Sequence, residues 1–318
     1  MNRRSCVIVG AGMTGITAGR VIQAAGWDVV LVDKGQTCGG RMATRQIGTG
    51  LFDSGAQFFT VRDDRFIEAV RDWERAGWVS EWFTCEGHIR YRATGGMNAL
   101  ASRLARSLDV RPATKVVLVE SEGNEWKVTA ESGEVFRARA LLLTPPAPQC
   151  AELLAGMGEH LSPDILPALR SIVYDPCLSL LVGMNRSSRV PAPGYVRPVD
   201  GPVEWIADNT AKGLALGGAA LTIHARAGFS RDYFAESEEA LARTLLDAAG
   251  PWMGGAAQHW QLKRWRYSRA VPDNRPDYLF SSAPAALVIA GDGFSVPRVE
   301  GAFLSGLAGA SKLMDSQP

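Results

Sequence analysis

The chain has 318 residues, of which 46% are hydrophobic and 21% charged, so it can bury one large core or two modest ones. A formal net charge of +1, with no window dominated by Lys and Arg, excludes the electrostatic footprint of a nucleic-acid-binding protein. No stretch approaches the roughly 20 apolar residues that span a bilayer, so we expect no membrane partner.

The chain opens with a predicted strand, glycine loop and helix. A short β-branched run at residues 7–9 leads into GAGMTG at residues 10–15, and a helical stretch follows over residues 16–25. The first glycine allows the tight turn, the second lets the backbone approach a pyrophosphate, and the third lets helix and strand pack closely. The helix N-terminus favours the diphosphate through its free N–H groups and positive dipole end. This fingerprint predicts the cofactor-binding residues Gly10, Gly12, Met13, Thr14 and Gly15.

A second predicted strand, at residues 28–32, ends at Asp33. This acid lies about 20 residues past the glycines, where a carboxylate accepts hydrogen bonds from a ribose and disfavours a 2′-phosphate. NAD and FAD both use this unit, and the segment CGGRM at residues 38–42 separates them. Its glycines would let another stretch of backbone run close to the cofactor, and Arg41 supplies a charge for phosphate or flavin. The segment favours FAD.

The middle of the chain has a different character. Apolar side chains at helical spacing predict an amphipathic helix over residues 62–82. After Pro145 the segments are punctuated by prolines, and alternating stretches at 178–182 and 219–224 predict an antiparallel sheet. A further helix is predicted over 234–249, across that sheet.

Two polar segments in this region have more than one interpretation. Trp205, Asn209 and Lys212 follow an apolar strand and are predicted to form a solvated loop, from which Asn209 could reach a ring carboxamide. The sequence KRWRY at residues 263–267 alternates cations with aromatics on a predicted strand beside the site. Such a strand could face substrate phosphates, but the prediction is a salt-bridged surface with Trp265 packed inward.

Taken together, these motifs resemble the FAD-dependent amine oxidase superfamily, and within it the renalase-like branch. The superfamily follows its Rossmann unit with a GGR loop and a D-x-G-A segment, which here is Asp53-Ser54-Gly55-Ala56. Motifs shared with the renalase-like branch extend along nearly the whole chain: residues 10–15, 33–34, 39–42, 55–60, 144–149, 223–224, 263–268, 291–294 and 299–306.

The resemblance implies how FAD is held. Val116 would give its backbone to the adenine, and Asp292 would hydrogen-bond near the ribityl chain or pyrophosphate. The helix starting near Val299 would point its N–H groups at the flavin O2 and N1 region, where negative charge accumulates on reduction. Attachment would be noncovalent, because no cysteine follows Cys177 to match the one that carries FAD in the monoamine oxidase branch. The implied cofactor set also contains Lys34, Gly40, Arg41, Met42, Gly55, Ala56, Gln57 and Thr144.

The expected fold is α/β, with a Rossmann-type FAD-binding domain of the p-hydroxybenzoate hydroxylase-like (GR2) kind. A mixed-sheet α+β substrate domain is expected as an insertion, because cofactor motifs occur at both ends of the chain. We expect residues 1–60, 95–150 and 285–318 in the FAD-binding domain and residues 61–94 and 151–284 in the substrate domain.

The resemblance implies an oxidase that converts 2- or 6-dihydro-NAD(P) isomers to NAD(P)+ while O2 is reduced to H2O2, a metabolite-repair activity. The protein then mainly positions the hydride donor, and no acid or base is obligatory. His224 is the candidate catalytic residue, able to bond a carboxamide or tune the flavin near neutral pH, with a satisfied core histidine as the equal alternative. Gln57, Phe59 and Asn209 complete the predicted substrate contacts.

Two other functions stay open: a flavin amine oxidase acting on a small amine, and a noncatalytic flavin-binding module. A long-tunnel desaturase is disfavoured by composition. The five cysteines are odd in number and lack C-x-x-C spacing, so no disulfide framework or metal site is expected and a reducing cytoplasm fits best. The expected partners are a small-molecule substrate and O2, with a monomer as the working hypothesis.

Overall fold

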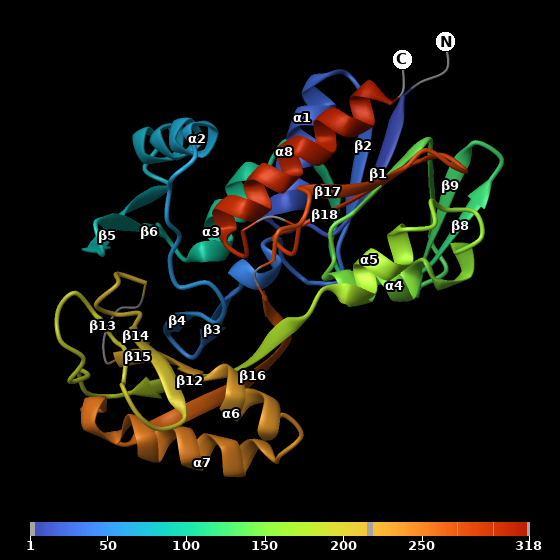
Figure 1. Cartoon of the computed structure of the whole chain (residues 1–318). Helices are drawn as coiled ribbons and strands as arrows, with labels where there is room; N and C mark the ends of the chain where they lie inside the picture. The colour runs from blue at the N-terminus through green and yellow to red at the C-terminus, as the bar shows by residue number, and fades with distance from the viewer. Residues whose placement is uncertain (1–3, 215–218, 272, 295, 317–318) are drawn as a thin grey trace.

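A computed structural model describes residues 4–214, 219–271, 273–294 and 296–316, so the outermost ends of the predicted FAD-binding segments lie outside the described residues. Figure 1 shows two lobes, one of which carries both termini. The long strands β12 (Tyr174–Met184) and β16 (Ala257–Ala270) run between the lobes.

The lobe with the termini is built on a six-stranded sheet in the order β17-β18-β11-β1-β2-β7. All neighbours are parallel except β17, which pairs antiparallel to β18 at one edge. Both faces are covered, so β11 and β18 are buried along their whole length, as parallel strands in α/β proteins are. The predicted α/β class is confirmed. The strands are β1 (Ser5–Val9), β2 (Asp28–Val32), β7 (Asp109–Arg111), β11 (Ala140–Leu143), β17 (Tyr278–Ser281) and β18 (Ala286–Ala290).

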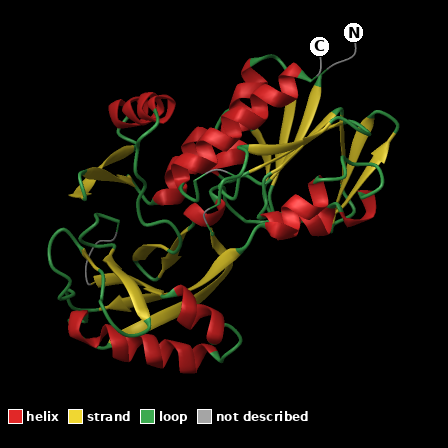
Figure 2. Cartoon of the chain, viewed as in Figure 1, coloured by secondary structure: helices red, strands yellow, loops and turns green. Residues whose placement is uncertain are grey.

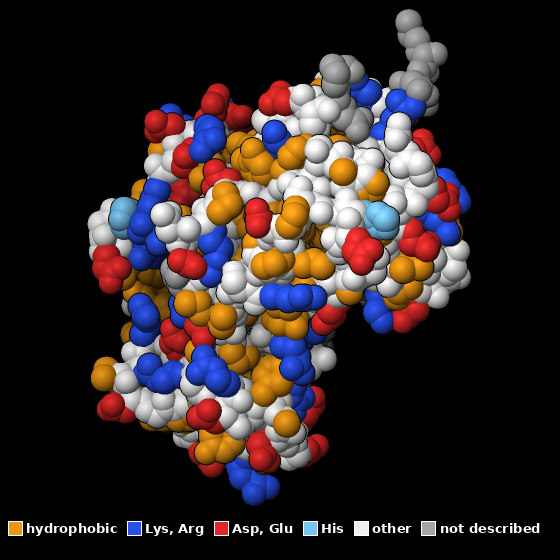
Figure 3. Space-filling view, turned by 45° about the vertical axis from the view of Figure 1, so that its right-hand side comes forward, with side chains coloured by type: hydrophobic (Ala, Val, Ile, Leu, Met, Phe, Trp, Pro, Cys, Tyr) orange, Lys and Arg blue, Asp and Glu red, His pale blue; other side chains and the backbone are white. Residues whose placement is uncertain are grey.

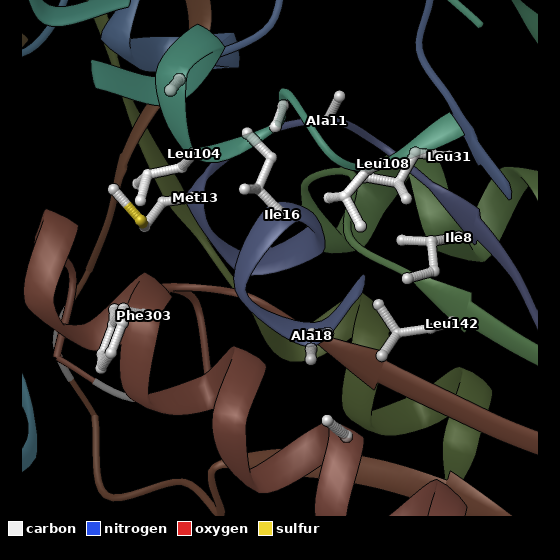
Figure 4. Packing of buried hydrophobic residues seen from close by; sticks show 14 of the residues in the cluster. Ile8, Ala11, Met13, Ile16, Ala18, Leu31, Leu104, Leu108, Leu142 and Phe303 are labelled. Carbon is white, nitrogen blue, oxygen red and sulfur yellow. The ribbon is translucent and has the colours of Figure 1, made fainter. Parts of the chain in front are cut away.

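Side-chain alternation along β1 divides the core between the two faces of this sheet. Ile8 packs with Ile16, Leu31 and Leu142 beneath the helices α1 (Met13–Ala24), α3 (Met97–Leu104) and α8 (Val299–Asp315) (Figure 4). Val7 and Val9 point the other way, because successive side chains of a strand face opposite sides. No helix in the described ranges has both the length and the apolar character needed to cross a bilayer.

The opposite face of the sheet carries a three-stranded sheet and two short helices. The small sheet has the order β10-β9-β8, and Trp126 at its centre is fully buried and donates its Nε1–H to the carbonyl of Ala286 at 3.0 Å. The elements on this face are β8 (Val116–Glu122), β9 (Glu125–Ala130), β10 (Val135–Ala138), α4 (Ala147–Leu153), the 3-10 turn η2 (Ala155–Met157) and α5 (Ile165–Ser171).

The second lobe is an antiparallel sheet in the order β13-β14-β15-β12-β16, which confirms the predicted sheet (Figures 1 and 2). The helix predicted over 234–249 is shorter than expected. It starts after Ser237, whose side chain accepts a hydrogen bond from the amide of Ala240 and so caps the N-terminus. The remaining elements of this lobe are β13 (Tyr195–Val196), β14 (Val203–Asp208), β15 (Ala219–Ala225), α6 (Ala227–Asp232), α7 (Glu238–Ala249) and η3 (Gly250–Trp252).

The helix predicted over residues 62–82 is also too long. Helix α2 (Asp64–Arg75) buries Phe66, Val70 and Trp73 as its spacing indicates. It ends before Gly77, which has a φ of +70° that favours glycine. Residues after that turn form the hairpin of β5 (Val79–Cys85) and β6 (His88–Ala93).

Between the lobes lies the hairpin of β3 (Thr44–Ile47) and β4 (Gly50–Asp53), preceded by the 3-10 turn η1 (Gly40–Met42) (Figure 1). Phe52 is fully buried against Leu181 and Ala220 of the antiparallel sheet. The hairpin therefore ties the glycine-rich lobe to the second lobe.

The packing of residues 151–172 and of β17 bears on where the substrate domain begins and ends. Residues 151–172 contribute Leu154, Ile165 and Leu169 to the same core as Val7 and Leu287, and β17 is an edge strand of the six-stranded sheet. The prolines after Pro145 mark a change in local structure. They do not mark the point at which the chain passes from the core of the first lobe to that of the second. We propose that the second segment of the substrate domain begins after residue 172 and ends before β17.

Candidate active site

A cavity of about 1300 Å³ runs between the lobes, from the glycine loop to the strands β12, β14 and β16. Sites for a single small ligand measure roughly 300–1,000 Å³. The cavity is therefore large enough for a cofactor and a second ligand together.

Two of the fingerprint glycines are required by close backbone contacts. A Cβ on Gly15 would lie 2.0 Å from the carbonyl oxygen of Gly10. Gly10 has a φ of +105°, and its Cβ would lie 2.2 Å from Oγ1 of Thr144. That hydroxyl donates to the carbonyl of Val9 at 2.9 Å, so Thr144 fixes the loop from the neighbouring strand. Gly15 itself lies behind the cavity wall, whereas Gly10 and Thr144 line it.

Gly12 is different, because nothing in the protein requires it. Its φ is −81°, and a Cβ built on it meets no atom within 4 Å. It is the N-cap of α1, has no side-chain cap and lines the cavity. The missing side chain therefore leaves open space in front of the free N–H groups of a helix N-terminus, which is the arrangement that binds a diphosphate.

Asp33 anchors the loop at the end of β2. Its two carboxylate oxygens accept hydrogen bonds from the amides of Ala11 and Gly35, each at 2.6 Å. Asp33, Lys34 and Val116 line the same end of the cavity. The residues predicted for the ribose and the adenine thus lie together.

A bidentate ion pair joins the GGR loop to the end of β18. The Arg41 guanidinium donates to the two carboxylate oxygens of Asp292 at 2.9 and 2.5 Å, and both residues line the cavity. Paired N–H···O bonds of this kind fix orientation as well as distance. Asp292 and Arg41 would therefore contact a cofactor together, as an ion pair.

The D-x-G-A segment packs directly on that loop. A Cβ on Gly55 would lie 2.0 Å from the carbonyl oxygen of Arg41, and the amide of Ala56 donates to the same oxygen at 2.9 Å. Gln57 follows, with its Nε2 donating to the carbonyl of Asp53 at 2.5 Å. Its Oε1 is buried with no hydrogen-bond partner in the described part of the chain, so an acceptor stands unused at the cavity wall.

Helix α8 begins at the cavity, as predicted for Val299. Its N-cap, Arg298, provides no side-chain cap, and Val299 and Ala302 line the cavity. Glu300 in the first turn is already engaged, because its Oε1 accepts from the amides of Arg62 and Asp63 at 2.5 and 2.8 Å.

His224 lines the cavity from β15 and is half-buried. Burial lowers its pKa to about 4, against the opposing effect of the Ser54 carbonyl, and the positive charge of Lys212 lowers it further. The imidazole is therefore neutral at physiological pH. Its Nε2 has no hydrogen-bond partner in the described residues, as for Gln57 Oε1.

For a His224→Gln variant we expect a pH profile of flavin reduction with the same shape as the wild type between pH 6 and 8. The folded-state pKa lies below the unfolded value of about 6.5, so the unfolded chain takes up this proton first. The wild type should therefore lose more unfolding free energy than the variant as pH falls from about 6.5 to about 4. Denaturant unfolding at several pH values measures this difference. A wild-type rate inflection near pH 6.5 that vanishes in the variant would contradict the assignment.

The strand segment 263–267 lines the cavity, and Arg264 also forms part of the predicted salt-bridged surface through its pair with Glu238 at 2.8 Å. Trp265 does pack inward, with its Nε1 donating to the carbonyl of Ser54 at 2.9 Å. Lys263 lies beside it, and its pKa is lowered by burial and by the nearby charges of Arg45 and Lys34. The long strand β16 crosses between the lobes, which brings these side chains to the site.

The predicted solvated loop is likewise a buried structure. Trp205 lies in β14 and lines the cavity, whereas Asn209 and Lys212 are fully buried outside it. The side-chain amide of Asn209 already has hydrogen-bond partners within the protein. Its oxygen accepts from the backbone amide of Asp53, and its nitrogen donates to the carbonyl of Ala220 and the hydroxyl of Thr222. We therefore do not carry Asn209 forward as a substrate contact.

The other predicted site residues line the cavity, with Gly15 and Asn209 as the exceptions. Phe59 also serves the core, stacking on Tyr91 with ring centroids 5.6 Å apart. Sequence reasoning missed six lining arginines that no motif marks: Arg45, Arg62, Arg90, Arg197, Arg269 and Arg298. The five cysteines are free thiols, and no group of His, Cys, Asp or Glu in the described ranges is arranged to hold a metal ion.

Comparisons with known proteins agree on one kind of protein. A family model described as flavin containing amine oxidoreductase matches residues 72–314, and one described as an NAD(P)-binding Rossmann-like domain matches residues 8–73. Renalase of Mus musculus is 22% identical over 329 aligned positions, which cover 95% of this chain and 96% of that protein.

Solved structures share the fold. Cyclohexylamine oxidase from Brevibacterium oxydans superposes with a TM-score of 0.72 at 13% identity, covering 98% of this chain and 99% of that one. A putrescine oxidase variant gives a TM-score of 0.70 at 14% identity, with the same coverage. Both similarities concern the fold.

Proposed function

Because the chain belongs to the flavin-containing amine oxidoreductase family, as a renalase-like, FAD-dependent oxidoreductase, we propose that it oxidises 2- or 6-dihydro isomers of NAD(P) to NAD(P)+. O2 would be the electron acceptor and H2O2 the second product. FAD, when bound, supplies the hydride acceptor and the route to O2.

The residues present fit that cofactor. Gly12 and the start of α1 offer a cradle for the diphosphate that a Cβ would fill. Asp33 and Val116 lie at one end for the adenosine, and the Arg41–Asp292 pair and the start of α8 lie along the cavity toward the second lobe. We also propose noncovalent attachment, so that acid denaturation releases the flavin from the protein.

The charge of the part of the cavity that faces the second lobe favours a dinucleotide substrate over an amine. The positive side chains that line this part, apart from Arg264, which is paired with Glu238, are Arg62, Arg90, Arg197, Lys263, Arg266, Arg269 and Arg298. The acids that line it are Glu86, Asp175 and Glu204. An excess of positive charge attracts the phosphates of a dinucleotide and opposes the entry of a cationic amine.

Anaerobic rapid mixing of the FAD-loaded protein with separated 2- and 6-dihydro-NAD tests the proposal. We expect the flavin absorbance band to bleach within the mixing experiment, and O2 to restore it with formation of H2O2. Small amines serve as the comparison. Bleaching by an amine alone would make the chain an amine oxidase, and no rapid bleaching by any of these reductants would make it a noncatalytic flavin-binding module.

A further inference from the structure

Three of the lining arginines come together from separate parts of the chain. Arg62 precedes α2, Arg90 lies on β6, and Arg298 is the N-cap of α8. The pKa of Arg298 is lowered by partial burial and by the positive charges of Arg62 and Arg90, against the opposing charge of Glu300. The amide of Arg62 also donates to the Glu300 carboxylate at 2.5 Å, which places Arg62 beside the start of α8, where Arg298 lies.

Two carboxylates, Glu86 and Glu300, lie near these three arginines, which leaves an excess of one positive charge. Arg90 has Glu86 at 3.8 Å, and 79% of that glutamate side chain is exposed to solvent. Glu300 is nearest to the other two, but its Oε1 accepts from the backbone amides of Arg62 and Asp63. Within the described ranges, no side-chain ion pair involves Arg62 or Arg298. A cavity wall on which arginines outnumber the nearby carboxylates is a feature of sites that bind an anion.

Arg90 is held in position on the aromatic part of the wall. Its side chain is only 12% exposed, its Nη1 donates to the carbonyl of His88 at 3.0 Å, and its guanidinium carbon lies 5.5 Å from the Phe58 ring centroid. Phe58 in turn lies 5.5 Å from Trp205, whose ring stacks on Tyr195 at 4.6 Å and 8°. A fixed planar cation beside aromatic rings suits a phosphate joined to a flat heterocycle.

We propose that Arg62, Arg90 and Arg298 form a subsite for the diphosphate of a dinucleotide substrate. On the face shown in Figure 3, Lys and Arg side chains recur along the waist between the lobes, among Asp and Glu side chains. The FAD diphosphate has its own cradle at Gly12 and α1, on different elements. The inference rests on the proposed function and adds that dihydronicotinamide dinucleotides are used in preference to the phosphate-free riboside.

The direct test is equilibrium binding of ADP-ribose to the FAD-loaded protein by calorimetry. ADP-ribose has the diphosphate and no reactive ring. Arg62→Gln, Arg90→Gln and Arg298→Gln should each raise its Kd about tenfold or more, since a charge-assisted hydrogen bond contributes about 1.5–3 kcal/mol. The matched control is Arg137→Gln on β10, where the arginine pairs with Glu122 away from the cavity. Adenosine should bind the wild type and all four variants alike.

The second measurement is the ratio of kcat/KM for dihydro-NAD to that for dihydronicotinamide riboside. We expect this ratio to fall about tenfold in each cavity variant and to stay at the wild-type value in Arg137→Gln. Unchanged Kd and unchanged ratio would overturn the subsite while the oxidase activity stands. Arginine-dependent ADP-ribose binding without any dihydropyridine oxidation would keep the subsite and reject the proposed function. Loss of FAD from the variants, seen in the ratio of flavin to protein absorbance, would also overturn the subsite, because the arginines would then hold the cofactor.

Discussion

A Gly12→Val variant is expected to fold like the wild type and to bind FAD about 10- to 100-fold more weakly. The valine side chain meets no protein atom within 4 Å at its Cβ, and the backbone of residue 12 is in the extended region that valine adopts readily. It fills the space in front of the helix N-terminus instead. Steric overlap between the FAD diphosphate and the valine side chain should reduce the free energy of binding by about 1–3 kcal/mol, which corresponds to the expected 10- to 100-fold loss of affinity.

Gly15→Ala is the matched comparison, because the same kind of change there should act on the fold. Its Cβ would lie 2.0 Å from the backbone oxygen of Gly10, which cannot move without opening the loop. We expect the melting temperature of the apoprotein to fall by several degrees for Gly15→Ala and to stay unchanged for Gly12→Val. Flavin fluorescence titration and thermal melts of both variants separate the two effects. Full FAD affinity in Gly12→Val would sink the assignment of the diphosphate to α1.

The glycine fingerprint could be predicted from sequence because its demands are local. Gly10, Gly12 and Gly15 lie in one strand, loop and helix unit, so the order of residues alone predicts the tight turn, the space in front of the helix N-terminus and the close approach of helix and strand. Asp33 and the GGR loop follow at short separations. The start of α8 at Val299 was predictable for a different reason, namely the likeness of residues 299–306 to a family motif.

The partners of buried polar residues could not be predicted in the same way. Lys212 looks solvated in sequence, and its counter-charge Asp53 lies 159 positions away. The alternating side chains of residues 263–267 do not show how long the strand is. In the structure, the strand β16 is long enough to carry these residues to the cavity between the lobes. The arginines at positions 62, 90 and 298 carry no motif, and only the fold brings them together.

The end of α2 was predicted too far along the chain for a related reason. A period of apolar residues shows which face of a helix is buried, but Gly77 stops the helix through a backbone conformation. Residues 151–172 follow the point at which prolines begin to punctuate the sequence, yet their apolar side chains share a core with β1. Composition predicts local structure. The core in which a segment packs depends on which faces of the sheets are still exposed when the rest of the chain has folded.

A Lys212→Met variant is expected to lose about 3–5 kcal/mol of unfolding free energy, because it leaves the Asp53 carboxylate buried without its counter-charge. Lys212 Nζ lies 2.5 Å from Asp53 Oδ2, and both side chains are 0% exposed. Burial lowers the pKa of Lys212, and Asp53 opposes that effect. The Thr44 hydroxyl and the Met97 amide still donate to Asp53, but neither supplies a charge.

The double variant Asp53→Asn/Lys212→Met should recover more than half of that loss, since the amide keeps an acceptor for Thr44 and Met97 while the buried charge is gone. The control is Lys127→Met, whose partly exposed pair with Glu120 should contribute little to the free energy of unfolding. Denaturant unfolding at saturating FAD measures all three variants. Asp53 begins the segment that packs on Arg41, so the single variant should also bind FAD more weakly than the wild type. The double variant should lose less FAD affinity than the single variant. Equal stability of Lys212→Met and wild type would mean that packing, and not the ion pair, joins the β3–β4 hairpin to the second lobe.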